Sequence, residues 1–375
     1  MRIACVVPGF SAGPADWAIP ALLDFVRTLA QTHEVHVFSQ RYPDRGIYRF
    51  DGIIHHALGG GQHFGLTSLT IWLQTGRAIM AQHRQTPFDL IHAFWADEAG
   101  FSAALAGRLI KRPVLVSLGG GELTRLPRID YGAQRFLARR LTTRYALAKA
   151  RLVTAGSNYQ LDLGRAHKIP NTKLRLAPLG VDPTRFRPEA SPHLGRDDKP
   201  PTIIQTASLL PVKNQALLLE VLALVKKAIP QIKLILAGSG PLADELDKLA
   251  QKLNLGHNID RRDHLPYLNL PELYQQAHLY LQTSLHESQG IAVLEGMACG
   301  LPVLGTPVGV VRDLACLPPQ TGAAALAAQV NELLSDATRY LTFKHRARHI
   351  IEQQYSLAIT TQTFQTLYQE ATHDP

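Results

Sequence analysis

Residues 285–310 read LHESQGIAVLEGMACGLPVLGTPVGV, and the fold prediction starts from this stretch. The apolar run AHLYLQTS just before it predicts a β-strand that ends at Ser284. The loop HESQG then leads into a short helix that begins near Gly290, and LPVLGTPVG predicts a further strand. A strand, a helix and a second strand in this order are typical of a parallel α/β sheet.

The same alternation of strands and helices runs through the rest of the chain. In the first half, strands are predicted at MRIACVVPGF, HEVHVFS, FDLIHAFWA and PVLVSL, with helical patterns between them. A stretch rich in proline and charge, residues 185–201, has the composition of a linker, and the alternation resumes with PTIIQTASLL. The pattern therefore predicts two doubly wound α/β domains in series, whose ligands bind beyond the carboxyl ends of the strands, in a cleft between the domains.

Length and composition agree with this reading. A chain of 375 residues with 46% hydrophobic residues is long enough for two domains with their own cores. No window approaches eighteen unbroken apolar residues, and the short apolar start predicts a first strand rather than a signal peptide. The three cysteines have no metal-ligand spacing, which suits a reducing cytoplasm.

The charge of the chain is uneven. Residues 1–199 hold 26 Lys+Arg against 15 Asp+Glu, a balance of +11, whereas residues 200–375 hold 13 against 15, or −2. Within the first half, residues 125–151 hold eight basic residues and one acid. This run predicts a surface that attracts anionic lipid or an anionic substrate. The alternative is a solvated basic helix face without a partner, and no nucleic-acid partner is expected.

The opening stretch also suggests a binding site. The first amides of a helix lack partners inside the helix and favour an anion, most often a phosphate, and Gly290 lets the backbone approach it. A carboxylate accepts hydrogen bonds from two neighbouring hydroxyls, as a sugar diol presents them. We therefore expect a phosphate at the helix start and sugar hydroxyls at Glu287 and Glu295. The alternative is a solvated Glu287 with Glu295 on an exposed helix face.

At this point the chain resembles a known family. Glu287 to Glu295, followed by GMACGLPVLGTPVG, resembles the E-x7-E region of the retaining glycosyltransferases of family 4, also described as glycosyl transferases group 1. The resemblance extends to the segments APLGVDPTRFRP, ASLLPVKNQ and LAGSGPLADELDKLA and to a closing helix at roughly 356–371. It implies the GT-B fold, two Rossmann-like doubly wound parallel-sheet domains facing an interdomain cleft. The implied parts are an acceptor-binding domain at 1–190, a donor-binding domain at 200–355 and a helix at 356–375 that crosses back to the first domain.

The resemblance implies transfer of a sugar from a nucleotide-sugar donor to an acceptor hydroxyl, with retention at the anomeric carbon. In that scheme Glu295 holds the nucleotide ribose, and Glu287 holds hydroxyls of the donor sugar near the reacting carbon. Lys213 contacts the donor phosphates, and Gly13 approaches them from the first domain. Glu287 and Lys213 are therefore the expected catalytic residues.

The remaining donor contacts are expected at backbone amides. The resemblance places the diphosphate and donor sugar against the amides of Gln289, Gly290 and Ile291. Negative charge grows on the β-phosphate as the glycosidic bond breaks, and a fixed lysine and a helix N-terminus stabilise it without a metal. The sequence has no Asp-x-Asp metal site, so no cofactor and no metal are expected. The departing phosphate itself would take the acceptor proton, with a short-lived covalent intermediate as the alternative.

The chain departs from the family pattern at two places. Ser208 occupies the donor-site position where the family usually has an arginine, five residues before the lysine. Arg125 and Arg128 are candidates to supply the missing phosphate contact, and the alternative is that they are ordinary surface arginines.

The second departure is the loop SLGGGELTRL. The family often has a histidine that touches the donor sugar at the position of Gly119, and Glu122 stands where an aspartate is common. We expect Gly119, Gly120, Gly121 and Glu122 to form a bare, flexible acceptor or sugar loop. Its amides form either an open backbone nest for an anion or merely a tight turn.

These observations predict a metal-independent retaining glycosyltransferase on the cytoplasmic side, peripheral at the membrane. Its acceptor would be a glycan, a lipid-linked sugar or a small molecule, in polysaccharide, glycolipid or cell-surface glycan synthesis. One alternative is a sugar-nucleotide epimerase on the same fold, and another is a degenerate nucleotide-sugar-binding partner subunit. GGGQHF at 59–64 is expected to be an acceptor-side loop, and His92 a core histidine rather than a ligand.

Overall fold

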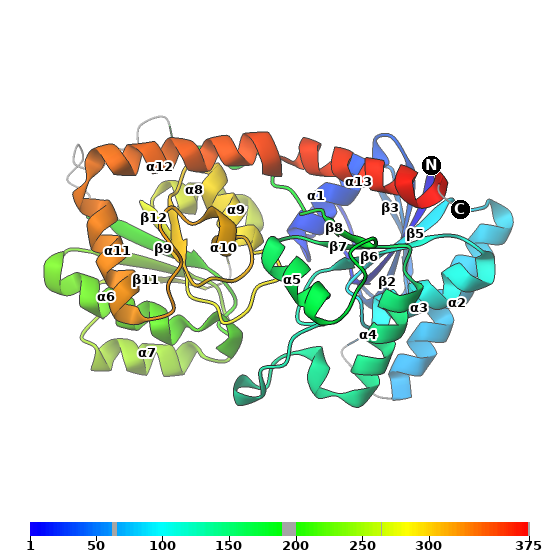
Figure 1. Cartoon of the computed structure of the whole chain (residues 1–375), viewed down its shortest axis with the longest axis horizontal. Coiled ribbons are helices and arrows are strands. Elements are labelled where there is room, and N and C mark those ends of the chain that lie inside the picture. The colour runs from blue at the N-terminus through cyan, green and yellow to red at the C-terminus, as the bar shows by residue number, and fades with distance from the viewer. Residues whose placement is uncertain (62–65, 190–199, 264, 374–375) are drawn as a thin grey trace. The chain divides into compact units, whose positions relative to one another are not determined.

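The computed structural model describes residues 1–61, 66–189, 200–263 and 265–373. Residues 62–64 of the expected loop at 59–64, and residues 190–199 of the expected linker, lie outside the described residues. Internal contacts divide the chain into two units (Figure 1). Unit 1 comprises Met1–Gly180 and Leu357–Pro375, and unit 2 comprises Val181–Ser356.

Unit 1 is built on a sheet with the strand order β3-β4-β2-β1-β5-β6-β7-β8. All neighbouring strands run parallel except β3, which pairs antiparallel with β4 at the edge. The strands are β1 (Arg2–Gly9), β2 (Glu34–Tyr42), β3 (Gly46–Phe50), β4 (Ile53–Ala57), β5 (Leu90–Phe94), β6 (Val114–Leu118), β7 (Leu152–Ala155) and β8 (Leu174–Leu176). β5 and β6 are buried at every position, as continuous apolar runs in parallel sheets usually are.

Among the described residues, six α-helices belong to unit 1 and lie around its sheet (Figure 1). They are α1 (Pro20–Ala30), α2 (Leu66–Gln85), α3 (Glu98–Ile110), α4 (Leu137–Lys149), α5 (Asn158–Ala166) and the C-terminal α13 (Leu357–His373). Within the described residues, no helix combines the length and the apolar composition that crossing a bilayer requires.

Unit 2 has an all-parallel sheet with the order β11-β10-β9-β12-β13. Its strands are β9 (Thr202–Thr206), β10 (Lys233–Ala237), β11 (Ile259–Arg262), β12 (Leu279–Gln282) and β13 (Val303–Gly305). Its helices are α6 (Gln215–Ala228), α7 (Ala243–Lys252), α8 (Leu270–Gln275), α9 (Ile291–Ala298), α10 (Val311–Leu314), α11 (Ala323–Ser335) and α12 (Ala337–Ile350). The strand order reverses between β9 and β12, which is where doubly wound sheets place their ligands.

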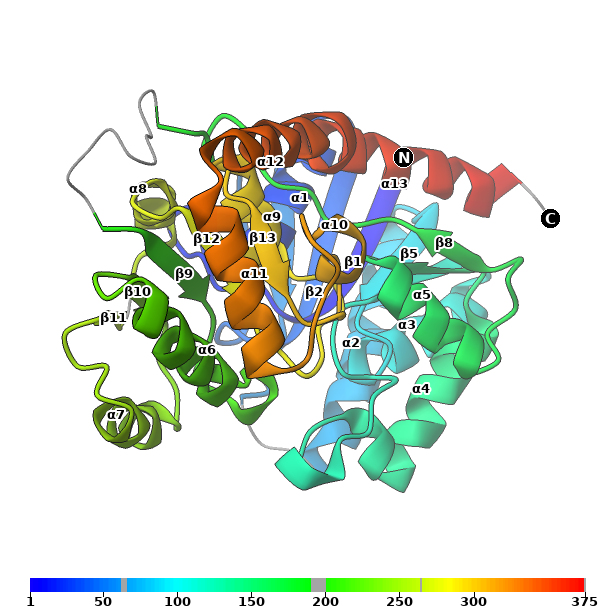
Figure 2. The same cartoon turned by 60° about the vertical axis from the view of Figure 1, so that its left-hand side comes forward.

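The two faces of the unit 2 sheet carry separate cores. Ile203 packs with α6, α7 and α11, whereas its neighbour Ile204 packs with α8, α9 and α12. Successive side chains of a strand point to opposite faces, so one apolar strand supplies both cores. Figure 2 shows α6 and α11 side by side on their common face.

The C-terminal helix α13 is part of the core of unit 1. Phe364 and Tyr368 are at most 1% exposed and pack beside β1 and β5. The Tyr368 hydroxyl lies 2.7 Å from His92 Nδ1, and the Ser117 hydroxyl lies 2.7 Å from His92 Nε2. His92 is fully buried and hydrogen-bonded at both nitrogens, so it is a core histidine, as the sequence predicted.

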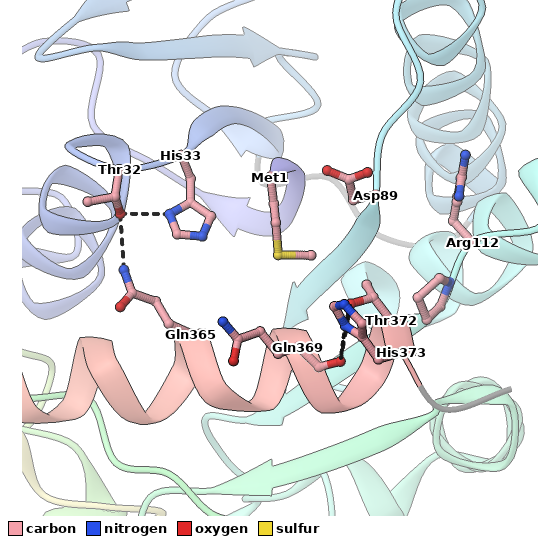
Figure 3. Close-up of a pocket in the computed structure, with 10 residues that line it drawn as sticks. Met1, Thr32, His33, Asp89, Arg112, Gln365, Gln369, Thr372 and His373 are labelled. Atoms are coloured by element: carbon pink, nitrogen blue, oxygen red, sulfur yellow. Dashed lines mark hydrogen bonds between the residues drawn. The ribbon is translucent and has the colours of Figure 1, made fainter.

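Figure 3 shows a cavity of about 830 Å³ beside α13 in unit 1. Its lining includes Met1, His33, Asp89 and Pro113, which directly precede β1, β2, β5 and β6, and also Arg112, and Gln365 on α13. The cavity therefore lies at the amino ends of the strands, opposite to the edge where such sheets bind ligands. The cavity lies where α13 packs on unit 1, and it is not a candidate active site.

Candidate active site

Two loops meet beyond the carboxyl ends of β9 and β12. The amide of Leu285 donates to the carbonyl of Val212 at 2.8 Å, and the Thr283 hydroxyl donates to the carbonyl of Lys213 at 3.2 Å. These bonds fix the segment after β9 against the segment after β12. The expected strand end at Ser284 is two residues later than the observed end of β12 at Gln282.

Lys213 and Glu287, predicted from distant parts of the sequence, are joined at this place. The ammonium of Lys213 donates to Glu287 Oε1 at 2.6 Å. Gln282 Nε2 and the Ser284 hydroxyl donate to the same oxygen at 2.9 Å each. The side chains of Lys213 and Glu287 are 24% and 13% exposed, so this ion pair is ordered by its surroundings yet accessible to a ligand. An ammonium carries three donors, and the pairing with Glu287 does not exhaust them.

The start of α9 lies directly after this cluster. Gly290 is its N-cap with φ +100°, a conformation that favours glycine. The carbonyl of Gln289 accepts a hydrogen bond from the amide of Val310 at 2.7 Å. Gly309 has φ +55°, and a Cβ at this position would lie 2.3 Å from the Gln289 carbonyl oxygen and 2.8 Å from Glu287 Cβ. The loop that follows β13 therefore packs directly against the candidate phosphate site.

Glu295 is buried inside unit 2. It is 4% exposed, and its Oε2 accepts a hydrogen bond from the Tyr274 hydroxyl at 2.9 Å. The Tyr274 hydroxyl in turn lies 2.6 Å from the Thr206 hydroxyl. Burial, and then the charge of Glu295, raises the pKa of Tyr274 well above its ordinary value, so Tyr274 stays a neutral donor. The alternative of an exposed, solvated Glu295 is therefore wrong.

Ser208 lies in the same loop as Lys213 and is exposed. Its backbone carbonyl accepts a hydrogen bond from Gln215 Nε2 at 3.1 Å, which ties the loop to the start of α6. The loop after β10 packs closely on this one, because a Cβ at Gly238 would lie 2.1 Å from the carbonyl oxygen of Ala207. Ile291, the first residue of α9, is half-buried.

Gly13 belongs to unit 1, in the loop that follows β1. Its carbonyl accepts a hydrogen bond from the amide of Asp16 at 3.2 Å. The carboxylate of Asp16 accepts from the amide of Ala12 at 2.7 Å and from the Tyr42 hydroxyl at 2.9 Å. No heavy atom would lie within 4 Å of a Cβ added to Gly13, so its surroundings are open.

The glycine loop after β6, also in unit 1, is not bare. The carboxylate of Glu122 accepts hydrogen bonds from the amides of Gly119, Gly120 and Ala96 at 3.0, 2.7 and 3.2 Å. Burial raises the pKa of Glu122, and the nearby charge of Asp97 adds to the effect. Of the two alternatives for this loop, the open nest for an external anion is therefore wrong, because these amides already bind the chain's own carboxylate.

Aromatic side chains also pack against the glycines of this loop. A Cβ at Gly119 or at Gly120 would lie 2.9 or 3.0 Å from the Trp95 side chain, and one at Gly121 would lie 2.9 Å from the Tyr131 ring. Trp95 itself has φ +68°, which is rare for a bulky residue. The three glycines are required because aromatic rings pack directly on the backbone.

The arginines proposed as substitutes at Ser208 do not belong to unit 2. Arg125 and Arg128 are exposed residues of the loop between β6 and α4, in unit 1. Sequence reasoning also missed Gln282, Ser284 and Tyr274, which hold the two glutamates. Among the described residues, no group of three or more His, Cys, Asp or Glu side chains is arranged to hold a metal ion.

Comparison with protein-family models identifies both halves of the chain. Residues 21–185 match the model described as Glycosyltransferase Family 4, and residues 186–350 match Glycosyl transferases group 1. Together the two matches span residues 21–350 without a gap. The protein is therefore a glycosyltransferase. It belongs to the family 4, group 1 glycosyltransferases, and its two parallel-sheet units are those of the GT-B fold.

Relatives and solved structures agree with this assignment over the length of the chain. N-acetyl-alpha-D-glucosaminyl L-malate synthase of Bacillus anthracis is 24% identical, over 91% of this chain and 90% of that protein. The GDP-mannose-dependent alpha-(1-6)-phosphatidylinositol monomannoside mannosyltransferase of Mycolicibacterium smegmatis is 24% identical, over 87% of each chain. The Anabaena protein Alr3699/HepE, solved with UDP and glucose, has 20% identity and a TM-score of 0.76, and covers 99% of this chain and 100% of its own.

Proposed function

We propose that the protein is a metal-independent, retaining glycosyltransferase that uses a nucleoside-diphosphate sugar as its donor. The observation that carries the proposal is the cluster in unit 2, where Lys213, Glu287 and the start of α9 lie at the switch point of a doubly wound sheet. Such a place combines a cation, backbone donors and a carboxylate within one accessible site. A diphosphate linked to a sugar offers the matching groups.

Within this proposal each residue has one role. Lys213 and the amides of Gln289, Gly290 and Ile291 bind the diphosphate. Oε1 of Glu287 is held by three donors, and this fixes the carboxylate that receives the sugar hydroxyls.

The nucleoside is assigned to the other glutamate. Glu295, held by Tyr274, receives the ribose hydroxyls. A carboxylate fixed in advance loses little conformational freedom when a diol binds to it.

The chemistry follows from where charge develops. As the bond from the anomeric carbon to the β-phosphate oxygen breaks, that oxygen gains negative charge and the sugar becomes cationic. Lys213 and the amides stabilise the phosphate, and they are already placed before the reaction. The acceptor oxygen attacks on the face that the phosphate leaves, and the phosphate oxygen takes the acceptor proton, so retention needs no basic side chain.

The donor base and the acceptor are proposed from the relatives. A GDP-mannose-dependent relative and a structural neighbour solved with UDP and glucose support GDP and UDP sugars as the first donors to test. One relative is named for L-malate and another for a phosphatidylinositol mannoside, which supports a hydroxylated small molecule or a lipid-linked glycan as acceptor. We propose a role in polysaccharide, glycolipid or cell-surface glycan synthesis at the cytoplasmic face of the membrane.

Donor turnover tests the reaction. The protein is incubated with UDP-glucose, UDP-N-acetylglucosamine or GDP-mannose and a panel of acceptors, with and without a chelator. We expect nucleoside diphosphate release that requires an acceptor and persists in the chelator, and a product whose anomeric proton shows the donor's configuration. An inverted product would contradict retention, and loss of activity in the chelator that added Mg²⁺ restores would contradict metal independence. Release of an epimerised donor without acceptor would favour the epimerase alternative.

A further inference from the structure

Unit 1 contains a groove of about 770 Å³ between α4 and the segment 167–173, which links α5 to β8. Its floor is apolar and includes the buried side chains of Leu147 and Ile169. Two leucines of α4 stand at its rim in solvent, Leu137 at 67% and Leu141 at 59% exposure. A surface with this much exposed leucine beside an apolar floor is unusual outside interaction sites.

The rim of the groove is strongly basic. Arg140 and Arg144 of α4 face it from one side, and Lys168 and Lys173 from the other. None of the described residues that line the groove is an acid. Residues 134–173, which include both sides, hold nine Lys+Arg against one Asp. The positive charge that the sequence indicated for unit 1 is therefore concentrated around one groove.

The leucines and arginines of α4 form two adjacent rows. Leu137 and Leu141 are four residues apart, as are Arg140 and Arg144, and each arginine follows a leucine by three residues. Residues three and four apart lie on one face of a helix, so the apolar and basic rows run side by side. Phe136, at the start of the helix, adds an aromatic side chain that is 49% exposed.

A buried hydroxyl in the groove points to a ligand with polar atoms. Thr143 lines the groove and is fully buried, and its Oγ1 has no hydrogen-bond partner among the described residues. A buried hydroxyl without a partner costs free energy, which a polar atom of a ligand in the groove would recover.

We propose that this groove and its rim dock on the surface of a membrane that contains anionic lipids. The arginines and lysines contact lipid phosphates, and Leu137, Leu141 and Phe136 insert below the headgroups. A soluble polyanion would use the basic row and leave the leucines in water, whereas a lipid surface uses both rows. The inference does not rest on the proposed function, and it would bring unit 1 to the place where lipid-linked acceptors lie.

Vesicle sedimentation tests the proposal with the full-length protein. Vesicles of neutral phosphatidylcholine are compared with vesicles that also contain anionic phosphatidylglycerol. We expect binding that requires the anionic lipid and falls steeply when salt rises from about 0.1 to about 1 M, because the Debye length then shortens from about 10 to about 3 Å. Equal binding to both vesicle types in high salt would overturn the proposal.

Matched variants separate the groove from net charge. Arg140→Gln with Arg144→Gln should weaken binding about 30-fold, since each basic residue near an anionic surface contributes about fivefold. Arg84→Gln with Arg108→Gln removes the same charge from exposed sites of α2 and α3 outside the groove and should change binding far less. An equal loss of vesicle binding in both double variants would mean that only net charge matters, and it would overturn the assignment of binding to the groove.

The leucine row has its own control. Leu141→Ala should weaken vesicle binding severalfold, whereas Leu109→Ala, at a leucine of α3 that is 65% exposed, should leave it unchanged. A different outcome would identify a soluble polyanion as the ligand in place of the membrane. In that case the protein would bind a soluble polyphosphate and not anionic vesicles, and the double arginine substitution would weaken this binding whereas Leu141→Ala would not. Each variant is first checked for an unchanged melting temperature, which excludes misfolding as the cause.

Discussion

At the scale of single residues, the two glutamates of residues 285–310 have different surroundings. Glu287 Oε1 accepts hydrogen bonds from an ammonium, an amide and a hydroxyl, whereas Glu295 is buried and accepts one from the Tyr274 hydroxyl at its Oε2. An accessible carboxylate beside a lysine suits the reacting end of a donor. A buried carboxylate with a neutral hydrogen-bond donor behind it suits a fixed diol further away.

Tyr274→Phe tests whether Tyr274 positions Glu295 for the ribose. Removing one hydrogen bond should weaken nucleoside diphosphate binding about fivefold, the equivalent of about 1 kcal/mol. Binding of the 2′,3′-dideoxy nucleoside diphosphate should not change, because it lacks the hydroxyls that Glu295 would receive. Isothermal titration measures both, and the same loss for both ligands would show that Tyr274 has only a structural role.

Lys213→Met tests stabilisation of the leaving phosphate. Loss of a fixed cation at a developing charge should lower kcat by roughly 100- to 1000-fold. Lys227→Met, at an exposed lysine of α6, is the control and should leave kcat unchanged. Steady-state kinetics with a saturating donor measures kcat for both variants. A kcat of Lys213→Met within threefold of that of the control would exclude Lys213 from this role.

At the scale of elements, the sequence predicted what local pattern determines. The strand, loop and helix around Gly290 could be predicted, since apolar runs and a glycine N-cap are local signals. The antiparallel strand β3 and the helices α11 and α12 were missed. β3 alternates between exposed and half-buried residues, and α12 has only two buried residues, so neither has a strong apolar pattern.

Contacts between distant segments were harder to predict. Tyr274 reaches Glu295 across 21 positions, and Lys213 reaches Glu287 across 74. The second of these pairs was expected to share a ligand because of the resemblance, and not because of a pattern in the sequence. The glycine loop after β6 was predicted to be bare, because the sequence does not show that the Glu122 carboxylate binds the amides of its own loop.

The loop after β13 supports the site through one glycine. Gly309→Ala should disturb Glu287 and Gln289, because the added methyl group would lie 2.8 and 2.3 Å from their atoms at a φ of +55°. We expect a loss of stability of about 1–3 kcal/mol and a clear loss of nucleotide affinity.

Gly256→Ala is the control for this substitution. No heavy atom would lie within 4 Å of the Cβ added at Gly256, so neither stability nor nucleotide affinity should change. Unchanged affinity in Gly309→Ala, measured by titration, would show that this loop does not support the donor site.

At the scale of the whole molecule, the two units should respond differently to acid. Burial lowers the pKa of several histidines of unit 1, and the largest shifts are to about 4 for His55 and His56 and to about 3 for His92. Between pH 6.5 and about 4 the unfolded chain binds more protons at these sites than the folded chain. Stability of unit 1 is therefore complete above pH 6.5 and falls as the pH drops to about 4, by roughly 2–3 kcal/mol per histidine.

Tryptophan fluorescence can follow this loss in unit 1 alone. All three tryptophans of the chain, Trp17, Trp72 and Trp95, belong to unit 1. Denaturant unfolding monitored by fluorescence at several pH values should show a stability that decreases from pH 6.5 downward, and His55→Asn should reduce this slope. A stability of unit 1 that stays constant between pH 6.5 and 4 would contradict the prediction.

The donor site is tested most directly by measuring thermal stability with saturating UDP, GDP or ADP, added one at a time to the wild type and to Glu295→Ala. A ligand at about 100 times its Kd adds about 2.7 kcal/mol, which raises Tm by a few degrees at this size. We expect a clear shift with at least one nucleotide in the wild type and its loss in the variant, whose own Tm should remain close to that of the wild type. No shift with any nucleotide would contradict the donor site, and an equal shift in the variant would show that Glu295 does not bind the ribose.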